Sequence, residues 1–235
     1  AWETVRNAAE FFPERVEVSV ERLPTNGGRP AGHNWLLEKY DHSAAEYIAI
    51  GDDDLIFVPP DWLRKMVNTA RAFTRSACVG ARAVNREWPH RIHGAAFHIT
   101  EFSDDTIRLS NHHEMDDHGQ FDVLDMADHV NGCLHIYERK ALEAVGHFDI
   151  RFSPAQFVDV EHHLRLRLAG YDVIFNGLIR VEHLRGMVNR SRERVGNSLG
   201  NAYKLIHKYL PEEVRRELTR RGEERIAWLS GESGH

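Results

Sequence analysis

Residues 47–58 read YIAIGDDDLIFV. An apolar run here leads directly into the acidic triplet Asp52, Asp53 and Asp54, and a second apolar run follows the triplet. Adjacent carboxylates repel one another and resist burial, so a buried strand that ends in them is costly. The cost is offset if the end of the strand faces a cleft that holds a divalent cation, because Mg²⁺ and Mn²⁺ prefer oxygen ligands. An acidic turn in solvent is the alternative.

Composition limits the class of protein. The chain has 235 residues, of which 42% are hydrophobic, so it can bury a full core. Its net charge of −6 argues against a nucleic-acid partner. Cys78 and Cys133 show no metal-type spacing, which favours free thiols in a reducing cytoplasm. No apolar run approaches the roughly 20 residues of a membrane span, and no signal peptide is visible.

Strand-like and helix-like segments alternate along the chain, which predicts an α/β domain with a mixed, mainly parallel central sheet. Strands are expected at 16–20, 47–50, 78–84, 171–175 and 178–181, and helices at 5–12, 34–40, 62–73, 139–145, 160–168 and 211–228. The polar stretch 85–128 is too long for a simple connection and is expected to be either functional or disordered.

Several short motifs then occur in a recognisable order. They are GGRPAGHN at 27–34, the acidic stretch above, PDWL at 60–63, NGC at 131–133, VGHFD at 145–149, DVE at 159–161 and VEH at 181–183. Together they resemble family 2 glycosyltransferases, which have the Rossmann-like GT-A fold, over roughly residues 16–183. The resemblance implies a GT-A domain at 1–190 and a C-terminal helical extension at 191–235. The first strands of that fold are not visible, so the chain is expected to enter the fold partway.

The resemblance also assigns the metal and the donor. It places Asp54 and His183 on Mn²⁺ or Mg²⁺, with Asp52 and Asp53 beside the donor. The chemistry agrees, because the departure of a nucleoside diphosphate leaves negative charge that a metal ion stabilises. A polar strand end is the alternative role for His183. A neutral imidazole together with a carboxylate suits Mn²⁺.

Asp159 is the candidate general base for the acceptor hydroxyl, and Glu161 is the fallback. The family usually has Glu-Asp at this point, whereas this chain has Val158 before Asp159, and an aspartate at the start of a helix can also serve as an N-cap. The remaining donor candidates follow from the family motifs, with an ordinary turn as the alternative for the glycines: Gly27, Gly28, Asn34, Asn131 and Gly132.

Other features outside these motifs leave alternatives open. Trp88 suits an acceptor-binding platform for a sugar ring, and burial in the core is equally compatible. Residues 112–118, HHEMDDH, offer a second metal cluster as one alternative, but a polar loop that forms part of the acceptor wall or a mobile lid is favoured. The basic segment 185–194 follows His183 and is placed to close over the donor diphosphate. The arginines of 215–225 could contact an anionic membrane surface, but a solvated helix is favoured.

These observations predict a metal-dependent inverting glycosyltransferase of the hexosyl or N-acetylhexosaminyl class. The expected donor is a nucleotide-diphosphate sugar, preferably a UDP-sugar, and the acceptor is a glycan, lipid or protein in polysaccharide biosynthesis. The expected location is the cytoplasm, with peripheral association at the inner membrane face. The alternatives are a non-catalytic glycan-binding or scaffold domain of the same fold, and a phosphohydrolase that combines the triplet with the histidine cluster.

Overall fold

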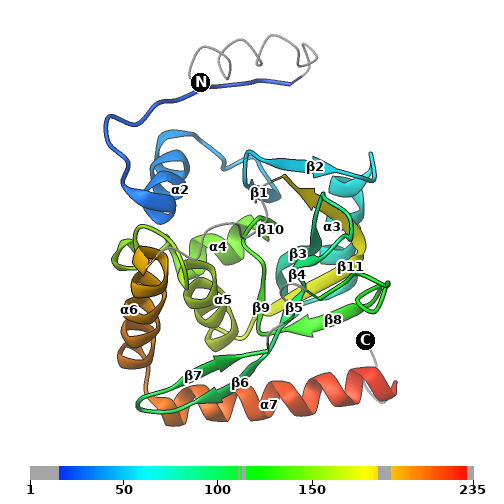
Figure 1. The fold of residues 1–235 in the computed structure, drawn as a ribbon, viewed down its shortest axis with the longest axis vertical. Coiled ribbons are helices and arrows are strands. Elements are labelled where there is room, and N and C mark those ends of the chain that lie inside the picture. Colours follow the sequence, from blue (N-terminus) through cyan, green and yellow to red (C-terminus); the bar gives the residue numbers. More distant parts are fainter. Residues whose placement is uncertain (1–15, 111, 113–114, 185–191, 232–235) are drawn as a thin grey trace.

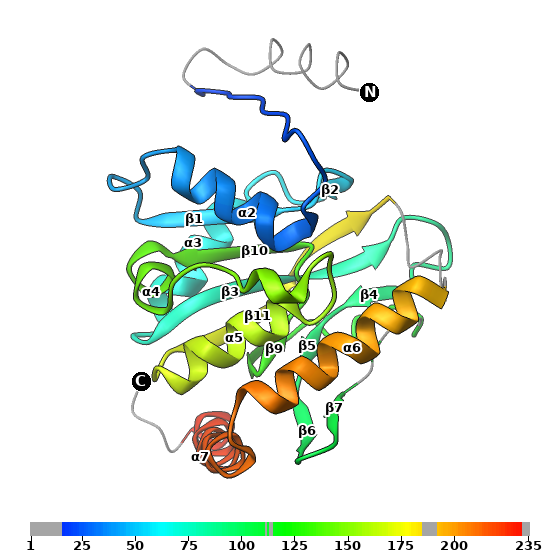
Figure 2. The same cartoon turned by 90° about the vertical axis from the view of Figure 1, so that its left-hand side faces the viewer.

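The protein is a three-layered α/β structure with helices on both faces of a seven-stranded sheet (Figure 1). The computed structural model describes residues 16–110, 112, 115–184 and 192–231. The turned view shows α3 behind the sheet, α2, α4, α5 and α6 in front of it, and α7 end-on below it (Figure 2). The helices are α2 (Gly28–Lys39), α3 (Trp62–Ala72), α4 (Arg139–Val145), α5 (Val158–Leu168), α6 (Arg192–Lys208) and α7 (Pro211–Ser230).

The central sheet is mixed, and most of its pairs are antiparallel. Its main path is β1 (Tyr47–Gly51), β10 (Leu134–Glu138), β3 (Ser76–Asn85), β11 (Asp172–His183) and β2 (Leu55–Phe57). Two more strands join its sides, β4 (Ile92–Gly94) beside β3 and β8 (Leu124–Ala127) beside β11. Among the described strands only β3 and β11 pair in parallel.

The prediction of a mainly parallel sheet was therefore wrong. A parallel pair needs a crossover connection, and here α5 lies within the only connection that produces one, between β3 and β11. The chain instead inserts β10 antiparallel between β1 and β3. Both edges of β10 are paired and its first four residues are buried, as in a strand of a parallel sheet.

Successive residues of the central strands face opposite layers, as the strand period of two requires. On β3, Val79 packs with Met66 of α3, whereas Cys78 packs on the other side with Leu164 of α5. On β10, Ile136 joins the α3 side and Tyr137 the α5 side. The α5 side therefore holds the larger core cluster, and polar residues on that side of the strands lie beneath α5.

Most expected elements are present with shifted bounds. The expected strands at 171–175 and 178–181 are one strand, β11, with a register irregularity between Asn176 and Arg180. Residues 17–23 are extended but belong to no strand, so the strand expected at 16–20 was wrong. The helix expected at 5–12 lies outside the described residues. Within 85–128 the chain forms short strands, including the pairs β5 (Ala96–Phe97) with β9 (His129–Val130) and β6 (Ile99–Phe102) with β7 (Ile107–Leu109).

The last two helices share the core and its ion pairs. Leu205 of α6 and Val214 of α7 belong to the larger core cluster. Arg221 of α7 is 6% exposed and pairs with Asp172, and Arg225 pairs with Asp125. The arginines on this face of α7 therefore bind it to the body of the protein. No described helix is long and apolar enough to cross a membrane.

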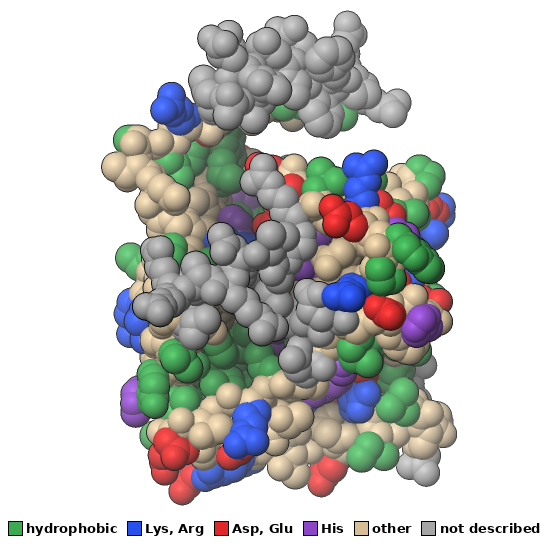
Figure 3. Space-filling view, in the orientation of Figure 1, with side chains coloured by type: hydrophobic (Ala, Val, Ile, Leu, Met, Phe, Trp, Pro, Cys, Tyr) green, Lys and Arg blue, Asp and Glu red, His purple; other side chains and the backbone are tan. Residues whose placement is uncertain are grey.

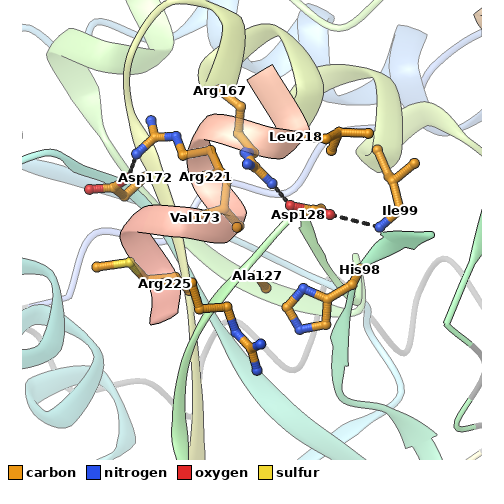
Figure 4. A pocket seen from close by; sticks show the side chains of 12 residues that line it. His98, Ile99, Ala127, Asp128, Arg167, Asp172, Val173, Leu218, Arg221 and Arg225 are labelled. Atoms are coloured by element: carbon orange, nitrogen blue, oxygen red, sulfur yellow. Dashed lines mark hydrogen bonds and ion pairs between the residues drawn. The ribbon is translucent and has the colours of Figure 1, made fainter. Parts of the chain in front are cut away.

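A cavity of about 220 Å³ lies between α7, the end of α5 and the start of β11 (Figure 4). Its three arginines are all paired with carboxylates, Arg167 with Asp128 and the two from α7 as above. Asp172, at the start of β11, lines this cavity, whereas His183 ends the same strand. The cavity is therefore at the opposite end of the sheet from the acidic triplet.

Candidate active site

The candidate site forms where β1, β3 and β11 end. β1 and β3 are both antiparallel to β10, and β3 is parallel to β11, so the three strands run in one direction. Their carboxyl ends carry Asp52 after β1, Asn85 on β3 and His183 on β11, and Asn85 lies opposite His183 in the register. The antiparallel strand β10 contributes its amino end there, at residues 131–133. The mixed sheet thus still gathers the predicted motifs at one edge.

A metal-type group, a set of side chains with the geometry of metal ligands, is formed by Asp52, Asp54 and His183. His183 Nε2 lies 3.6 Å from Asp52 Oδ2 and 3.4 Å from Asp54 Oδ1. One ligand atom from each of the three lies within 4.8 Å of the others. Two carboxylates and one imidazole form a donor set that suits Mn²⁺. These residues therefore fit a divalent cation, with Asp52 placed among the potential ligands as well as Asp54.

The backbone fixes this group from two sides. The Asp52 amide donates to the Cys133 carbonyl at 2.8 Å, which continues the pairing of β1 with β10. The Leu184 amide donates to the Asp54 carbonyl at 2.9 Å, next to the pairing of β2 with β11. The triplet therefore connects the strands at the two ends of the sheet path, which holds its carboxylates over the end of β11.

His93 and Asn131 support His183. The rings of His93 and His183 stack with centroids 4.3 Å apart. The Asn131 amide group donates to the His93 carbonyl at 3.3 Å and accepts from the Cys133 amide at 2.8 Å. Gly94 leaves room for this arrangement, because a Cβ there would overlap the Asn131 side chain. Asn131 thus contributes to the position of His183, a role that the sequence did not suggest.

Arg29 joins the metal-type group to the candidate base. Its guanidinium lies 3.1 Å from Asp52 Oδ1 and 3.7 Å from Asp159 Oδ2, and it also donates to the Gly132 carbonyl. Burial opposes the charge of Arg29, but Asp159 and Asp52 raise its pKa above the ordinary arginine value. One cation therefore holds the two carboxylates on either side of it. Arg29 stands within the motif at 27–34, but it was not among the predicted site residues.

Asp159 has the surroundings of a proton acceptor. Its side chain is 16% exposed, and its Oδ1 is buried without a hydrogen-bond partner among the described residues. Burial opposes ionisation, but Arg29 and then His135 lower the pKa of the carboxyl below its usual value. Asp159 is therefore ionised at neutral pH. Gly132 permits its position, because a Cβ at Gly132 would lie 2.6 Å from Asp159 Oδ1 and closer still to Oδ2.

The loop before α5, which positions Asp159, has a strained backbone. Gln156 and Phe157 have φ of 69° and 59°, a left-handed conformation that is costly for residues with side chains. Asn201 of α6, 1% exposed, donates to the carbonyls of Phe152, Ala155 and Gln156 at 2.8–2.9 Å. These bonds fasten the loop to α6, and so determine the direction in which α5 begins.

Gly27 and Gly28 bring Arg29 to this loop. Gly28 has φ of 80°, and a Cβ there would lie 2.6 Å from the Pro154 Cα. The Arg29 amide donates to the Pro154 carbonyl at 2.8 Å, and the Ser153 hydroxyl donates to the Gly27 carbonyl at 3.0 Å. The glycines therefore permit close backbone contact within the protein, and their predicted contact with the donor stays a prediction.

Other predicted residues have structural partners. The Asn34 amide group makes two hydrogen bonds to the Phe148 backbone. Glu161 is fully buried, and its carboxylate pairs with Arg165 and Lys208 and accepts from the Tyr209 hydroxyl at 2.7 Å. The Lys208 and Tyr209 contacts join α5 to the end of α6, and the Arg165 pair lies within α5. Glu161 is therefore poorly placed to act as the base.

Asp53 and Trp88 are exposed. Trp88 is 85% exposed, which excludes the alternative of a core tryptophan. It follows the end of β3, and the nearby Arg86 amide donates to the His183 carbonyl at 3.3 Å. Trp88 is therefore at the same edge of the sheet as the candidate site. In the space-filling view, acidic, basic and histidine side chains are visible in the hollow between α2 and β2 (Figure 3).

The described members of the 112–118 cluster lie elsewhere. His112 packs against Phe97 and Phe121, and Asp117 pairs with Arg82. Residues 113 and 114 lie outside the described residues, as does the segment 185–191. Among the described residues, the groups with metal-ligand geometry do not include this cluster. The phosphohydrolase alternative, which needs the cluster beside the triplet, has no support in the described part of the chain.

The fold and site define an α/β domain with an aspartate–histidine group of metal-ligand geometry at the carboxyl edge of its sheet. The model of glycosyl transferase family 2 matches residues 2–146, more than half of the chain, and the chain belongs to that family. Its fold is GT-A-like. A comparison with curated proteins found no match.

Two solved structures show the likeness in fold. GalNAc-T7 with UDP, GalNAc and Mn²⁺ aligns with a TM-score of 0.60 at 13% identity, over 83% of this chain and 38% of that one. The mannosyltransferase PcManGT from Pyrobaculum calidifontis, in complex with GDP-Man and Mn²⁺, aligns with a TM-score of 0.51 at 15% identity, over 97% of this chain and 65% of that one. This chain thus spans less than two thirds of either protein.

Proposed function

We propose that the protein is a metal-dependent inverting glycosyltransferase that uses a nucleotide-diphosphate sugar. The observation that carries the proposal is the bridge through Arg29. It places a metal-type group, Asp52, Asp54 and His183, on one side of a guanidinium and an ionised carboxylate, Asp159, on the other. A transferase needs this arrangement, because the leaving group and the attacking hydroxyl are on opposite sides of the anomeric carbon.

In the proposed reaction, Asp52, Asp54 and His183 hold Mn²⁺ or Mg²⁺, which when bound supplies positive charge to the departing diphosphate. Asp159 accepts the proton of the acceptor hydroxyl as the hydroxyl oxygen bonds to the anomeric carbon. The bond from that carbon to the diphosphate oxygen breaks in the same displacement, so the configuration inverts. Arg29 keeps Asp159 ionised before the acceptor arrives.

The nature of the substrates belongs to the proposal as well. The two similar structures contain UDP with GalNAc and GDP-Man, each with Mn²⁺, which supports a nucleoside-diphosphate donor here. A UDP-sugar of the hexose or N-acetylhexosamine class is the preferred donor, and a glycan, lipid or protein is the acceptor. Trp88, exposed at the same edge, is the proposed stacking surface for an acceptor sugar.

The proposal is tested by binding and turnover with a panel of UDP- and GDP-sugars, with and without Mn²⁺. We expect Mn²⁺-dependent binding of at least one donor, and transfer or slow hydrolysis that releases the nucleoside diphosphate. Asp159→Asn should abolish transfer and retain donor binding, because the change preserves shape and removes the proton acceptor. If the wild-type protein bound no nucleotide sugar in the presence of Mn²⁺, the proposal would be overturned.

A further inference from the structure

A second group of ligand-type side chains lies in the interior, beneath α5. Cys78 of β3, His135 of β10 and His163 of α5 are each no more than 1% exposed. A ligand atom from each lies within 4.8 Å of the other two. The register places Cys78 opposite Tyr137, two residues after His135, so both strands direct these side chains toward the α5 side. None of them takes part in the proposed transfer.

The spacing suits a tetrahedral ion. Cys78 Sγ lies 3.4 Å from His163 Nε2. Zinc–sulfur and zinc–nitrogen bonds of about 2.3 and 2.0 Å place the two ligand atoms of a tetrahedral site about 3.5 Å apart. The Tyr137 hydroxyl, 3.1 Å from His163 Nε2, is close enough to occupy or cap a fourth position. Cysteine sulfur and imidazole nitrogen together favour zinc over Mn²⁺ or Mg²⁺.

The buried ring of His135 is an independent indication that this group binds a metal ion. It is fully buried, and neither of its ring nitrogens has a hydrogen-bond partner among the described residues. A buried polar group without a partner is destabilising and is rare in native proteins. Within the group, Cys78 and His163 are hydrogen-bonded to each other, whereas His135 has no hydrogen-bond partner among the described residues. A metal ion at the centre of the group would satisfy His135.

The surroundings of His163 are those of a metal ligand. Its Nδ1 lies 2.9 Å from His129 Nδ1, so a hydrogen bond on that side leaves Nε2 directed toward Cys78. Ligating histidines usually make such a bond through their second nitrogen, which fixes the tautomer and the ring orientation. His163 also follows Asp159 by one helical turn, so the two side chains share a face of α5.

We propose that Cys78, His135 and His163 form a structural Zn²⁺ site, separate from the metal-type group at Asp52, Asp54 and His183. The ion would connect β3, β10 and α5, the helix that carries Asp159, and so hold the candidate base against the sheet. The thiolate and two neutral imidazoles leave a net single positive charge on the bound ion. The negative charge of Asp159, on the same helix face, partly balances it.

The test is cobalt substitution in the full chain. Because the site is buried, Co²⁺ is supplied in the growth medium, and the purified protein is examined by metal analysis and absorption spectroscopy. We expect one Co²⁺ per chain with a thiolate-to-cobalt charge-transfer band and the visible bands of a tetrahedral ion. Zinc-supplemented cultures should yield one Zn²⁺ per chain.

Matched variants assign the signal. Cys78→Ser and His135→Gln should lose the charge-transfer band or the bound metal. Cys133→Ser, which changes the other buried thiol, should retain both, as should Asp54→Asn, which changes the separate metal-type group. Retention in Cys78→Ser, or loss in Cys133→Ser, would overturn the assignment. So would folded wild-type protein that contains neither metal after supplementation. His135→Gln keeps the test decisive if Cys78→Ser does not fold.

Discussion

Gly132→Ala is the sharpest test of how Asp159 is positioned. The added Cβ would lie 2.6 Å from Asp159 Oδ1 and closer to the other carboxylate atoms, whereas ordinary contact begins at about 3.5 Å. The carboxylate must therefore retreat by at least about 1 Å, the distance that Oδ1 alone requires. A displacement of that size at a reacting group can cost about 100-fold in rate. We predict such a loss in kcat, with Mn²⁺-dependent donor binding nearly unchanged, because Asp52, Asp54 and His183 are not displaced.

The assay is release of the nucleoside diphosphate under saturating donor and acceptor, together with urea denaturation. Overpacking should lower the free energy of unfolding by about 1–3 kcal/mol. Gly200→Ala in α6 is the matched control, since nothing lies within 4 Å of its added Cβ, and it should be neutral or stabilising. In an Asp159→Ala background the destabilisation by Gly132→Ala should largely vanish. A Gly132→Ala enzyme with a kcat close to that of the wild type would refute the proposed position of the base.

Three further predictions concern the surroundings of the site. Asn201→Ala removes three hydrogen bonds to the strained loop, so it should lower the free energy of unfolding by about 1–3 kcal/mol and also reduce kcat; unchanged urea denaturation would contradict this. Glu161→Gln should destabilise the fold and retain turnover, whereas Asp159→Asn should retain stability and lose turnover. Urea denaturation and rate measurements on both variants test this contrast. Burial lowers the pKa of His33 and His162 to about 4 from about 6.5, so the unfolded chain takes up protons first as the pH falls. Each histidine should then reduce stability by about 1.4 kcal/mol per pH unit between about pH 6.5 and 4, and His162→Gln should flatten the profile measured by urea denaturation.

The metal-type group was the part of the site most accessible from sequence. Asp54 stands between two apolar runs and His183 ends another, so their places in the fold follow from short-range patterns. Their expected role as metal ligands came from the family resemblance. Asp52 was expected nearer the donor, and the structure also places it within reach of His183. Its side chain lies between that histidine and Arg29, a relation that involves three separate elements.

Arg29 could not be predicted in its bridging role. Its reach depends on the contact of Gly28 with Pro154, more than 100 residues away in the sequence, and a GGRP stretch by itself indicates only a turn. The prediction that the strands run mainly parallel was wrong for a similar reason. Burial on both faces, as in β10, is compatible with either direction, and the direction of a strand depends on the connections around it. The alternation at 16–20 likewise predicted a strand that has no pairing partner among the described residues.

Mn²⁺ binding in the presence of UDP or GDP, measured by calorimetry on the wild-type protein, Asp54→Asn and Asp53→Asn, tests the central claim most directly. The two variants remove the same charge from adjacent residues. Of these two residues it is Asp54 whose carboxylate lies beside His183, with Oδ1 3.4 Å from Nε2. We predict that Asp54→Asn weakens Mn²⁺ binding by at least about tenfold, since loss of even a supporting partner of a metal ligand often costs that much. Asp53→Asn should bind like the wild type. Equal binding by Asp54→Asn and the wild type, or equal losses in the two variants, would contradict the account.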